Sequence, residues 1–460
     1  MSRLVIVSNR LPIGRPSGAG GELEIPAGGL VSAVLSALQR RPGSLWLGWD
    51  SKAEPKPDRL TQHQASGVLL LGLGLSRAEL DGYYRGFCNE TLWPLLHCFQ
   101  GRVHLDVNHA AFYRRVQTRF ARALHSILRA GDLVWVHDYH LLLLGRELRQ
   151  LGWKGKIGFF LHTPFPPYDL WRILPNPADF LRALGDYNLV GFHTASYRDN
   201  YLYSCKRELK ASWSGSELRT TTGRQRVGVY PVGIEPRDFQ PEHTGRRKQH
   251  RYLSRIVGSD VQVVLGVDRL DYTKGIPERI RAFESLIRRW PQWRGKVCLV
   301  QIASPSRTTL HQYEEQKRLV DRLVGRVNGE LADPDWVPIR YLYRSFSRSG
   351  LIRFYSAAHV GLVTPLRDGM NLVAKEFVAG QYPEDPGVLV LSRFAGAAEE
   401  LSDAIQVNPY LPDDTAEGIA RALEMPLEER CKRHQALFAE VSRATASEWA
   451  RRFTADLANA

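Results

Sequence analysis

Cysteine is scarce in this sequence, and its spacing disfavours the folds that depend on it. The 460 residues contain five cysteines, an odd number, and no CxxC pair. A disulfide scaffold or a zinc ribbon is therefore disfavoured, and a reducing compartment is favoured. We expect a cytoplasmic protein.

Long apolar runs are absent as well. No run approaches the ~20 residues that a helix needs to span a bilayer. The start of the chain holds only the short apolar stretch 4–7, which lacks the long core of a signal peptide and predicts a first strand. We expect neither a membrane partner nor a cleaved leader.

Two common phosphate-binding fingerprints are also missing. The sequence contains no GxxxxGKS/T motif and no GxGxxG motif. Neither a P-loop ATPase nor a typical dinucleotide-binding enzyme is therefore indicated.

Positive charge is present in excess. Lys and Arg number 62 against 48 Asp and Glu, a formal net charge of +14. The basic residues are dispersed over most predicted helices, and the densest cluster is Arg246, Arg247 and Lys248. A dispersed excess is typical of a solvated surface, so we expect no nucleic-acid partner. Arginine predominates, and guanidinium groups suit bidentate contacts with phosphate.

Apolar, strand-like runs alternate with amphipathic stretches along the chain. One series of predicted strands comprises residues 4–7, 45–48, 68–71, 133–136, 157–161, 190–192 and 227–230. A second comprises residues 261–267, 297–302, 339–343, 360–363, 388–391 and 404–407. The predicted helices are residues 31–38, 112–128, 142–151, 177–187, 196–209, 277–289, 309–327, 350–357, 372–381, 415–423 and 444–455. This alternation predicts two doubly wound α/β domains, with a break near residues 231–240.

Three loops carry features of anion-binding sites. The Gly28-Gly29 turn before a predicted helix lets backbone N–H groups approach an anion closely. Arg269 and Lys274 lie on one strand-to-helix loop and suit a diphosphate. The loop before residue 372 leads to a further helix start, where Asp368 can bind a hydroxylated substrate and Glu376 a ribose diol. Taken singly, each feature is also compatible with an ordinary turn or a surface charge.

Histidines lie at the ends of two predicted strands. His137 and His140 are three residues apart, but no further Cys, His or carboxylate spacing supports a metal site there, and we predict none. His162, taken alone, is compatible with either a buried structural histidine or a functional one.

Together these segments resemble the trehalose-6-phosphate synthase family of glycosyltransferases. The motifs occur in the family's order and cover almost the whole chain. They are SNRLP at 8–12, GGL at 28–30, LWP at 92–94, VHDYHL at 136–141, FFLHTPFP at 159–166, VDRLDYTKGIP at 267–277, VTPLRDGMNLVAKE at 363–376 and LSRFAGAAE at 391–399.

The resemblance implies the GT-B glycosyltransferase fold, an α/β architecture of two facing Rossmann-like domains with the active site in the interdomain cleft. We expect an N-terminal acceptor-binding domain at residues 1–236 and a C-terminal nucleotide-sugar-binding domain at 237–440. Residues 441–460 are expected to form a C-terminal helix that can pack back on the N-terminal domain. No DxDxT phosphatase segment occurs and no length remains for one, so the product is expected to stay phosphorylated.

The implied activity is a retaining, metal-independent transfer of glucose from UDP-glucose to glucose 6-phosphate, which gives α,α-trehalose 6-phosphate and UDP. UDP-glucose is then a substrate, and no cofactor or metal is expected. The sequence is compatible with a homo-oligomer. Three alternatives stay open: another acceptor such as glycerol 3-phosphate, another nucleotide-glucose donor, or a catalytically silent sugar-phosphate sensor.

The resemblance also implies roles for individual residues. The implied catalytic residues are Asp138, His162, Arg269, Lys274 and Asp368. The implied acceptor-binding residues are Arg10, Tyr84, Trp93, Asp138 and Arg307. The implied donor-binding residues are Gly29, His162, Arg269, Lys274, Asp368, Gly369, Met370, Asn371, Leu372, Val373 and Glu376. No segment offers a clear carboxylate pair for double displacement. The resemblance instead implies attack on the face from which the leaving group departs.

Overall fold

Two sheets, one in each of two structural units, organise the chain. Unit 1 comprises Met1–Val232 and Ala446–Ala460, and unit 2 comprises Gly233–Thr445. The computed structural model describes residues 2–13, 16–17, 22–23, 29–39, 41–53, 59–221, 223–241, 253–254, 256–307 and 310–460. Gly28 and the Arg246, Arg247 and Lys248 cluster lie outside the described residues.

The sheet of unit 1 has the strand order β10-β11-β12-β9-β8-β7-β1-β4-β6-β5. Pairing is parallel from β12 to β6 and antiparallel at both edges, where β10, β11 and β5 are added. The strands are β1 (Leu4–Arg10), β4 (Leu45–Trp49), β5 (Leu60–Ala65), β6 (Val68–Leu73), β7 (Leu133–His137), β8 (Lys156–Phe160), β9 (Leu189–Phe192), β10 (Ser212–Ser214), β11 (Glu217–Thr220) and β12 (Gly223–Val229). Strands β7 and β9 are buried throughout, because helices cover both faces.

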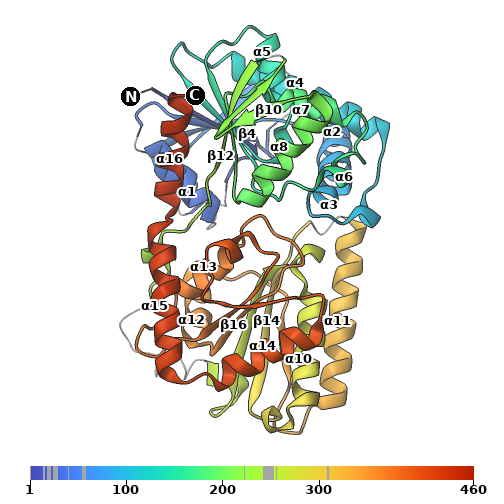
Figure 1. Ribbon diagram of the computed structural model, residues 1–460, viewed down its shortest axis with the longest axis vertical. Helices are drawn as coiled ribbons and strands as arrows, with labels where there is room; N and C mark the ends of the chain where they lie inside the picture. Colours follow the sequence, from blue (N-terminus) through green and yellow to red (C-terminus); the bar gives the residue numbers. More distant parts are fainter. Residues whose placement is uncertain are drawn as a thin grey trace. The chain divides into compact units, whose positions relative to one another are not determined.

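Helices from both ends of the sequence cover this sheet. They include α1 (Gly29–Gln39), α4 (Val107–His125), α5 (Leu144–Gln150), α7 (Pro177–Leu184), α8 (Ala195–Leu209) and α16 (Ala446–Ala458). Helix α16, red in Figure 1, lies beside the blue α1 and contacts β7, β8 and β9. The Phe453 ring stacks on Trp135 at 4.5 Å between centres. A Cβ atom at Gly158 would lie 2.8 Å from the Phe453 ring, so glycine permits this close approach of helix to sheet.

The sheet of unit 2 is parallel throughout, with the order β15-β14-β13-β16-β17-β18. Its strands are β13 (Gln262–Arg269), β14 (Val297–Ser304), β15 (Ile339–Leu342), β16 (Val360–Val363), β17 (Val388–Ser392) and β18 (Ile405–Val407). Its helices include α10 (Ile276–Arg289), α11 (His311–Leu331), α12 (Arg348–Ala357), α13 (Leu372–Ala379), α14 (Pro412–Glu424) and α15 (Leu427–Arg443). The strand order reverses at β13 and β16, and open α/β sheets bind ligands at the strand ends beside such a reversal.

The predicted α/β class with parallel sheets is confirmed, and every predicted strand overlaps an observed one. The edge strands β5, β10 and β11 went unpredicted, since their sequences lack an apolar run. Helix α15 was missed because only His434, Leu437 and Val441 are buried along its length. Helix α4 begins at Val107, earlier than predicted, because Asp106 caps it while Val107 itself is exposed.

Two further sequence-based expectations concern the pairing of the cysteines and the presence of membrane-spanning helices. The five cysteines are all free thiols. Among the residues that the structure describes, no helix combines the length and apolar character that a membrane crossing requires.

Candidate functional site

Arg10 ends strand β1 and begins a line of aromatic side chains in unit 1. Its guanidinium lies 5.5 Å from the centre of the Trp49 ring, and Trp49 lies 6.0 Å from Tyr84. The Tyr84 ring in turn stacks on His140, at 6.0 Å between centres. A guanidinium stacked on a ring still presents its N–H donors to an anion. Arg10 and Tyr84, both expected to bind the acceptor, thus belong to one continuous set.

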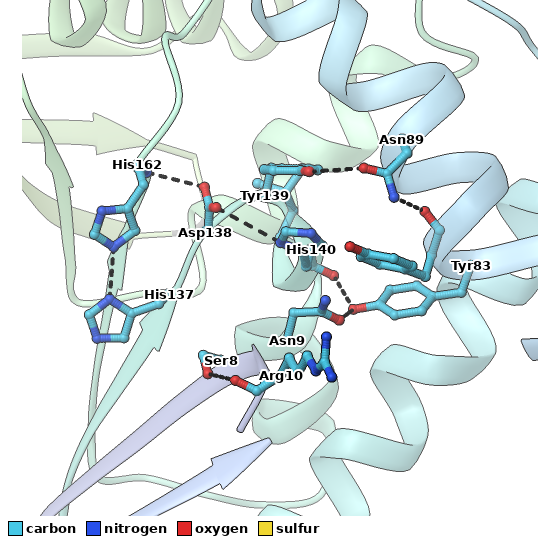
Figure 2. Close-up of polar contacts among 12 residues, drawn as sticks. Ser8, Asn9, Arg10, Tyr83, Asn89, His137, Asp138, Tyr139, His140 and His162 are labelled. Atoms are coloured by element: carbon cyan, nitrogen blue, oxygen red, sulfur yellow. Dashed lines mark hydrogen bonds and ion pairs between the residues drawn. The ribbon is translucent and has the colours of Figure 1, made fainter. Parts of the chain in front are cut away.

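The helix that carries Tyr84 has unusual hydrogen bonding. Helix η1 (Leu80–Leu92) is a π-helix, so the N–H that follows it, on Trp93, donates to the carbonyl five residues back. Such helices are rare and are frequent at functional sites. Tyr83 Oη donates to Asn9 Oδ1 at 2.8 Å, and Figure 2 shows these two side chains meeting below His140. Helix η1 is therefore tied to the end of β1.

Trp93 lies at the start of helix α3 (Trp93–Leu96) and is 5 % exposed. Its ring centre is 5.8 Å from that of Tyr139. Asn89 Nδ2 donates to the carbonyl of Tyr84 at 2.5 Å, which holds the last turn of η1. Trp93 packs as a core aromatic. Tyr139 lies between it and the stacked rings of Tyr84 and His140.

Asp138 follows β7 in a backbone conformation that few residues adopt. Its φ is +74°, a cost that non-glycine residues bear mainly at functional sites. Its N–H donates to the carbonyl of Phe160 at 2.8 Å, and its Oδ1 accepts from the N–H of His162 at 3.2 Å. Its Oδ2 lies 3.9 Å from His140 Nδ1. Asp138 therefore joins the ends of β7 and β8 (Figure 2).

His162 is partly buried and is held by the fully buried His137. His137 Nδ1 lies 3.0 Å from His162 Nε2, so one ring donates and the other accepts. Burial lowers the pKa of His137 well below its ordinary value, and His162 lowers it further. Burial and the nearby His193 likewise lower the pKa of His162. Both rings are therefore neutral at pH 7.

Unit 2 gathers cations around one buried carboxylate, that of Asp271. Arg307 Nη1 lies 3.6 Å from Asp271 Oδ2, and Tyr313 Oη donates to the same oxygen at 3.1 Å. Burial acts to raise the pKa of Asp271, but the charges of Arg307, Arg269 and Lys274 outweigh it and lower the pKa to about 2. Asp271 is thus an anion at neutral pH, and it interacts electrostatically with three cations.

Lys274 also forms an ion pair with a residue of the neighbouring loop. Its Nζ lies 2.5 Å from Asp368 Oδ2, and Asn371 Nδ2 donates to the same oxygen at 3.0 Å. Asp368, which was expected to bind hydroxyl groups of a substrate, therefore also accepts hydrogen bonds from two side chains of the protein. The loops approach closely at Gly275, where φ is +64° and a Cβ atom would lie 2.1 Å from the Thr364 carbonyl.

Helix α13 carries the remaining residues expected to bind the donor. Glu376 is partly buried and accepts a hydrogen bond from Tyr355 Oη at 2.9 Å. Burial raises the pKa of Glu376, although the Tyr355 bond and the charge of Arg348 oppose the shift. Gly369 and Met370 are buried ahead of the helix, whereas Leu372 and Val373, in its first turn, are partly exposed.

The predicted residues therefore fall into two groups. Unit 1 holds Arg10, Gly29, Tyr84, Trp93, Asp138 and His162, and unit 2 holds Arg269, Lys274, Arg307 and the residues from Asp368 to Glu376. Gly29 begins helix α1. Arg307, expected with the acceptor set, lies in unit 2 beside Asp271.

Sequence reasoning missed the residues that support these groups. Asp271 lay within a quoted motif but was given no role, and neither was Tyr313. Arg279 is fully buried below the same loops, where it donates to Asp268 at 2.6 Å, Gln301 at 2.8 Å and Thr364 at 3.0 Å. The only available signal was an arginine on the apolar face of a predicted helix.

The two groups suit different chemistry. The cations of unit 2, fixed in place by Asp271, can bind a diphosphate and stabilise negative charge as it develops. The neutral histidines and Asp138 of unit 1 can bind sugar hydroxyl groups, its aromatic rings can pack against the apolar face of a sugar, and Arg10 can bind an anionic substituent.

The chain is similar in sequence and structure to known proteins over almost its whole length. The model of glycosyltransferase family 20 matches residues 2–459. A trehalose-6-phosphate synthase of Sinorhizobium fredii is 42 % identical over 462 residues, which cover 99 % of this chain and 98 % of that protein.

Solved structures agree. An E. coli trehalose-6-phosphate structure bound with UDP-2-fluoro glucose matches with a TM-score of 0.93 and 38 % identity, over 100 % of this chain and 99 % of that one. A UDP-forming α,α-trehalose-phosphate synthase of Burkholderia xenovorans in complex with glucose-6-phosphate matches with a TM-score of 0.91 and 39 % identity, over 99 % of this chain and 100 % of that one.

Proposed function

Because the chain belongs to glycosyltransferase family 20, we propose that it transfers glucose from UDP-glucose to glucose 6-phosphate with retention of configuration. The products are α,α-trehalose 6-phosphate and UDP. The observation that carries the proposal is the group of three cations around Asp271, in a chain similar to structures bound with UDP-2-fluoro glucose and with glucose-6-phosphate. The two groups of residues act on one pair of substrates.

Unit 2 binds the donor in this proposal. Arg269 and Lys274 bind the diphosphate, and Glu376 accepts hydrogen bonds from the ribose. Asp368 binds hydroxyl groups of the transferred glucose while Lys274 and Asn371 hold its carboxylate in place. Asp271 keeps the cations in position before the donor arrives, so little reorganisation is needed when charge develops.

Unit 1 binds the acceptor and lines the reacting sugars. Arg10 binds the phosphate of glucose 6-phosphate. Tyr84 forms apolar surface against the sugar ring, and buried Trp93 supports it from the core through Tyr139 and His140. Asp138 and neutral His162 hydrogen-bond the reacting sugars, and His137 holds the His162 ring in one tautomer.

The chemical step needs no protein nucleophile. The bond between C1 of the donor glucose and the β-phosphate oxygen breaks, and C1 bonds to the O1 oxygen of the acceptor on the same face. The acceptor hydroxyl gives its proton to the departing phosphate, and the electron pair of the broken bond leaves with UDP. Arg269 and Lys274 stabilise that charge, so we propose that the reaction needs no metal. We also propose that the protein acts in the cytoplasm.

A donor-by-acceptor activity matrix with product mass tests this function. UDP-glucose with glucose 6-phosphate should release UDP and yield a phosphorylated disaccharide. Glycerol 3-phosphate, ADP-glucose and GDP-glucose provide the competing arms. A preference for glycerol 3-phosphate would overturn the acceptor assignment, and no transfer with any pair would leave a sugar-phosphate sensor.

A further inference from the structure

A cluster of metal-binding side chains lies outside the site described above. In the part of unit 1 that the structure describes, Glu90, His104 and His109 each offer a ligand atom, and these atoms lie within 4.8 Å of one another. Glu90 is near the end of η1, His104 is in the loop after it, and His109 is in the first turn of α4. None of the three takes part in the transfer proposed above.

The backbone holds the three residues together independently of any ion. The N–H of His104 donates to the carbonyl of Glu90 at 2.9 Å, and Thr91 Oγ1 donates to the carbonyl of His104. Asp106 caps α4 by accepting from the N–H of His109 at 3.1 Å. The side chains therefore start from fixed positions and need only small rotations to converge.

The imidazole of His109 has a nitrogen that the described protein does not use. His109 Nδ1 is buried and has no hydrogen-bond partner among the described residues. The ring lies against Gly86, where a Cβ atom would come within 2.4 Å of Nδ1. An unsatisfied buried polar atom costs about 1–3 kcal/mol, and a bound ion can remove that cost.

The other two side chains face each other at the surface. Glu90 Oε2 and His104 Nδ1 are 3.7 Å apart, and the two side chains are 36 % and 60 % exposed. Two ligands bonded to a tetrahedral ion at about 2.1 Å lie about 3.4 Å apart. Side-chain rotations that move the ligand atoms of Glu90 and His104 by about an ångström would therefore bring all three ligand atoms to bonding distance of one ion.

We propose that Glu90, His104 and His109 bind one divalent transition-metal ion of the zinc class. Two imidazoles and one carboxylate form a ligand set typical of Zn²⁺, Co²⁺ or Ni²⁺, whereas Mg²⁺ and Ca²⁺ prefer oxygen ligands. Solvent occupies the fourth position at this exposed site. The ion joins η1, the helix that carries Tyr84, to the start of α4, so it stabilises that segment.

Metal titration of the full chain tests the proposal. The protein is stripped with EDTA, dialysed, and titrated with Co²⁺ by visible absorption and with Zn²⁺ by calorimetry. Wild type should bind at least one equivalent, with absorption bands of imidazole-bound Co²⁺. His104→Ala should bind one equivalent fewer, or bind it at least about 100-fold more weakly, because even the loss of an outer-shell partner costs 10–100-fold.

Two further variants make the result specific. Glu90→Gln keeps the shape of the side chain and should also lose the site. His125→Ala removes an exposed histidine from the far end of α4 and should bind as wild type does. Zn²⁺ should raise the melting temperature of wild type and of His125→Ala but not that of His104→Ala. Equal stoichiometry and affinity in wild type and His104→Ala, or no saturable binding by wild type, would overturn the site.

Discussion

Ions build the candidate site of unit 2, whereas aromatic rings and neutral histidines build that of unit 1. In unit 2, Asp271 faces three cations and Lys274 pairs with Asp368 at 2.5 Å. In unit 1, Arg10 stacks on Trp49, and buried His137 shares a hydrogen bond with the partly buried His162. Both regions follow buried parallel strands, so the fold alone does not set this difference.

The contrast follows the charge that each region has to bind. A nucleoside diphosphate leaving group gains negative charge during transfer, and preorganised cations stabilise it. Cations that face one another repel, so a buried carboxylate is needed to hold them. A sugar is neutral, so neutral imidazoles can bind its hydroxyl groups and rings can pack on its apolar face without the cost of burying a charge.

The largest expected effect comes from removing the carboxylate that holds the cations. Asp271→Asn should lower the free energy of unfolding by about 3–5 kcal/mol, because the largely buried Arg307 loses the carboxylate with which it pairs. Denaturant unfolding of wild type and variant measures this loss.

A matched control lies on the surface of the same unit. Asp321, 42 % exposed, pairs with Lys317 at 2.5 Å on helix α11. Asp321→Asn should cost no more than about 1 kcal/mol. Equal losses in the two variants would show that Asp271 has no special place among the ion pairs of unit 2.

Removal of one cation should act on donor binding rather than on folding. Arg269→Ala should weaken UDP-glucose binding by about 2–4 kcal/mol, because a charge-assisted contact is lost. Calorimetry measures the change. Arg281→Ala, which removes an arginine paired with Glu278 on the neighbouring α10, is the control and should bind the donor as wild type does. Unchanged affinity in Arg269→Ala would contradict the proposed diphosphate contact.

Mild acid should destabilise unit 1 more than unit 2. The pKa values of His137 and His162 are lowered in the folded protein, so their stabilising effect is complete above about pH 6.5 and is lost as the pH falls below that value. The loss reaches about 1.4 kcal/mol per pH unit for each histidine. Asp271, with a pKa of about 2, loses its contribution only below about pH 4.

Hydrogen exchange at pH 7 and pH 5, corrected for intrinsic rates, measures this difference. Peptides of β7 and β8 should lose more protection than peptides of β13 and β14. Peptides of α15 are set aside, since burial also lowers the pKa of His434. Greater loss in β13 and β14 would reverse the comparison.

The smallest expected effect is on catalysis and comes from His137, which positions His162 through a hydrogen bond. His137→Phe keeps a ring in place but removes the hydrogen bond to His162. The kcat should fall about tenfold, which corresponds to about 1.4 kcal/mol, while both KM values change little. Steady-state kinetics measures this split, and exposed His125→Gln is the control. A lower melting temperature with unchanged kcat would make His137 purely structural.

The sequence could predict most of the fold because the buried strands are continuous apolar runs. The same runs located Asp138, His162 and Arg269, since each lies at or just after the end of a strand. The pairing of His137 with His162 needed one further fact, that β7 and β8 are neighbours with His137 opposite Phe160. Strand adjacency is a tertiary property that the apolar runs do not encode.

Other features depended on local geometry without a sequence pattern. The π-helix η1 departs from the 3.6-residue period on which helix prediction depends. Arg307 has a φ of +46°, so its direction does not follow from neighbouring elements. The role of Asp271 depends on Arg307 and Tyr313, which belong to distant parts of the chain.

Unit 1 can complete its fold only after unit 2 has been synthesised, because helix α16 follows unit 2 in the sequence. Unit 1 needs this helix, whose Phe453 and Trp449 pack on Trp135, yet the helix leaves the ribosome only after all of Gly233–Thr445. At about 5–20 residues per second, that delay is roughly 10–40 s. During this time the surface of β7 and β8 that α16 covers stays exposed, so unit 1 presents apolar surface until the second unit has been synthesised.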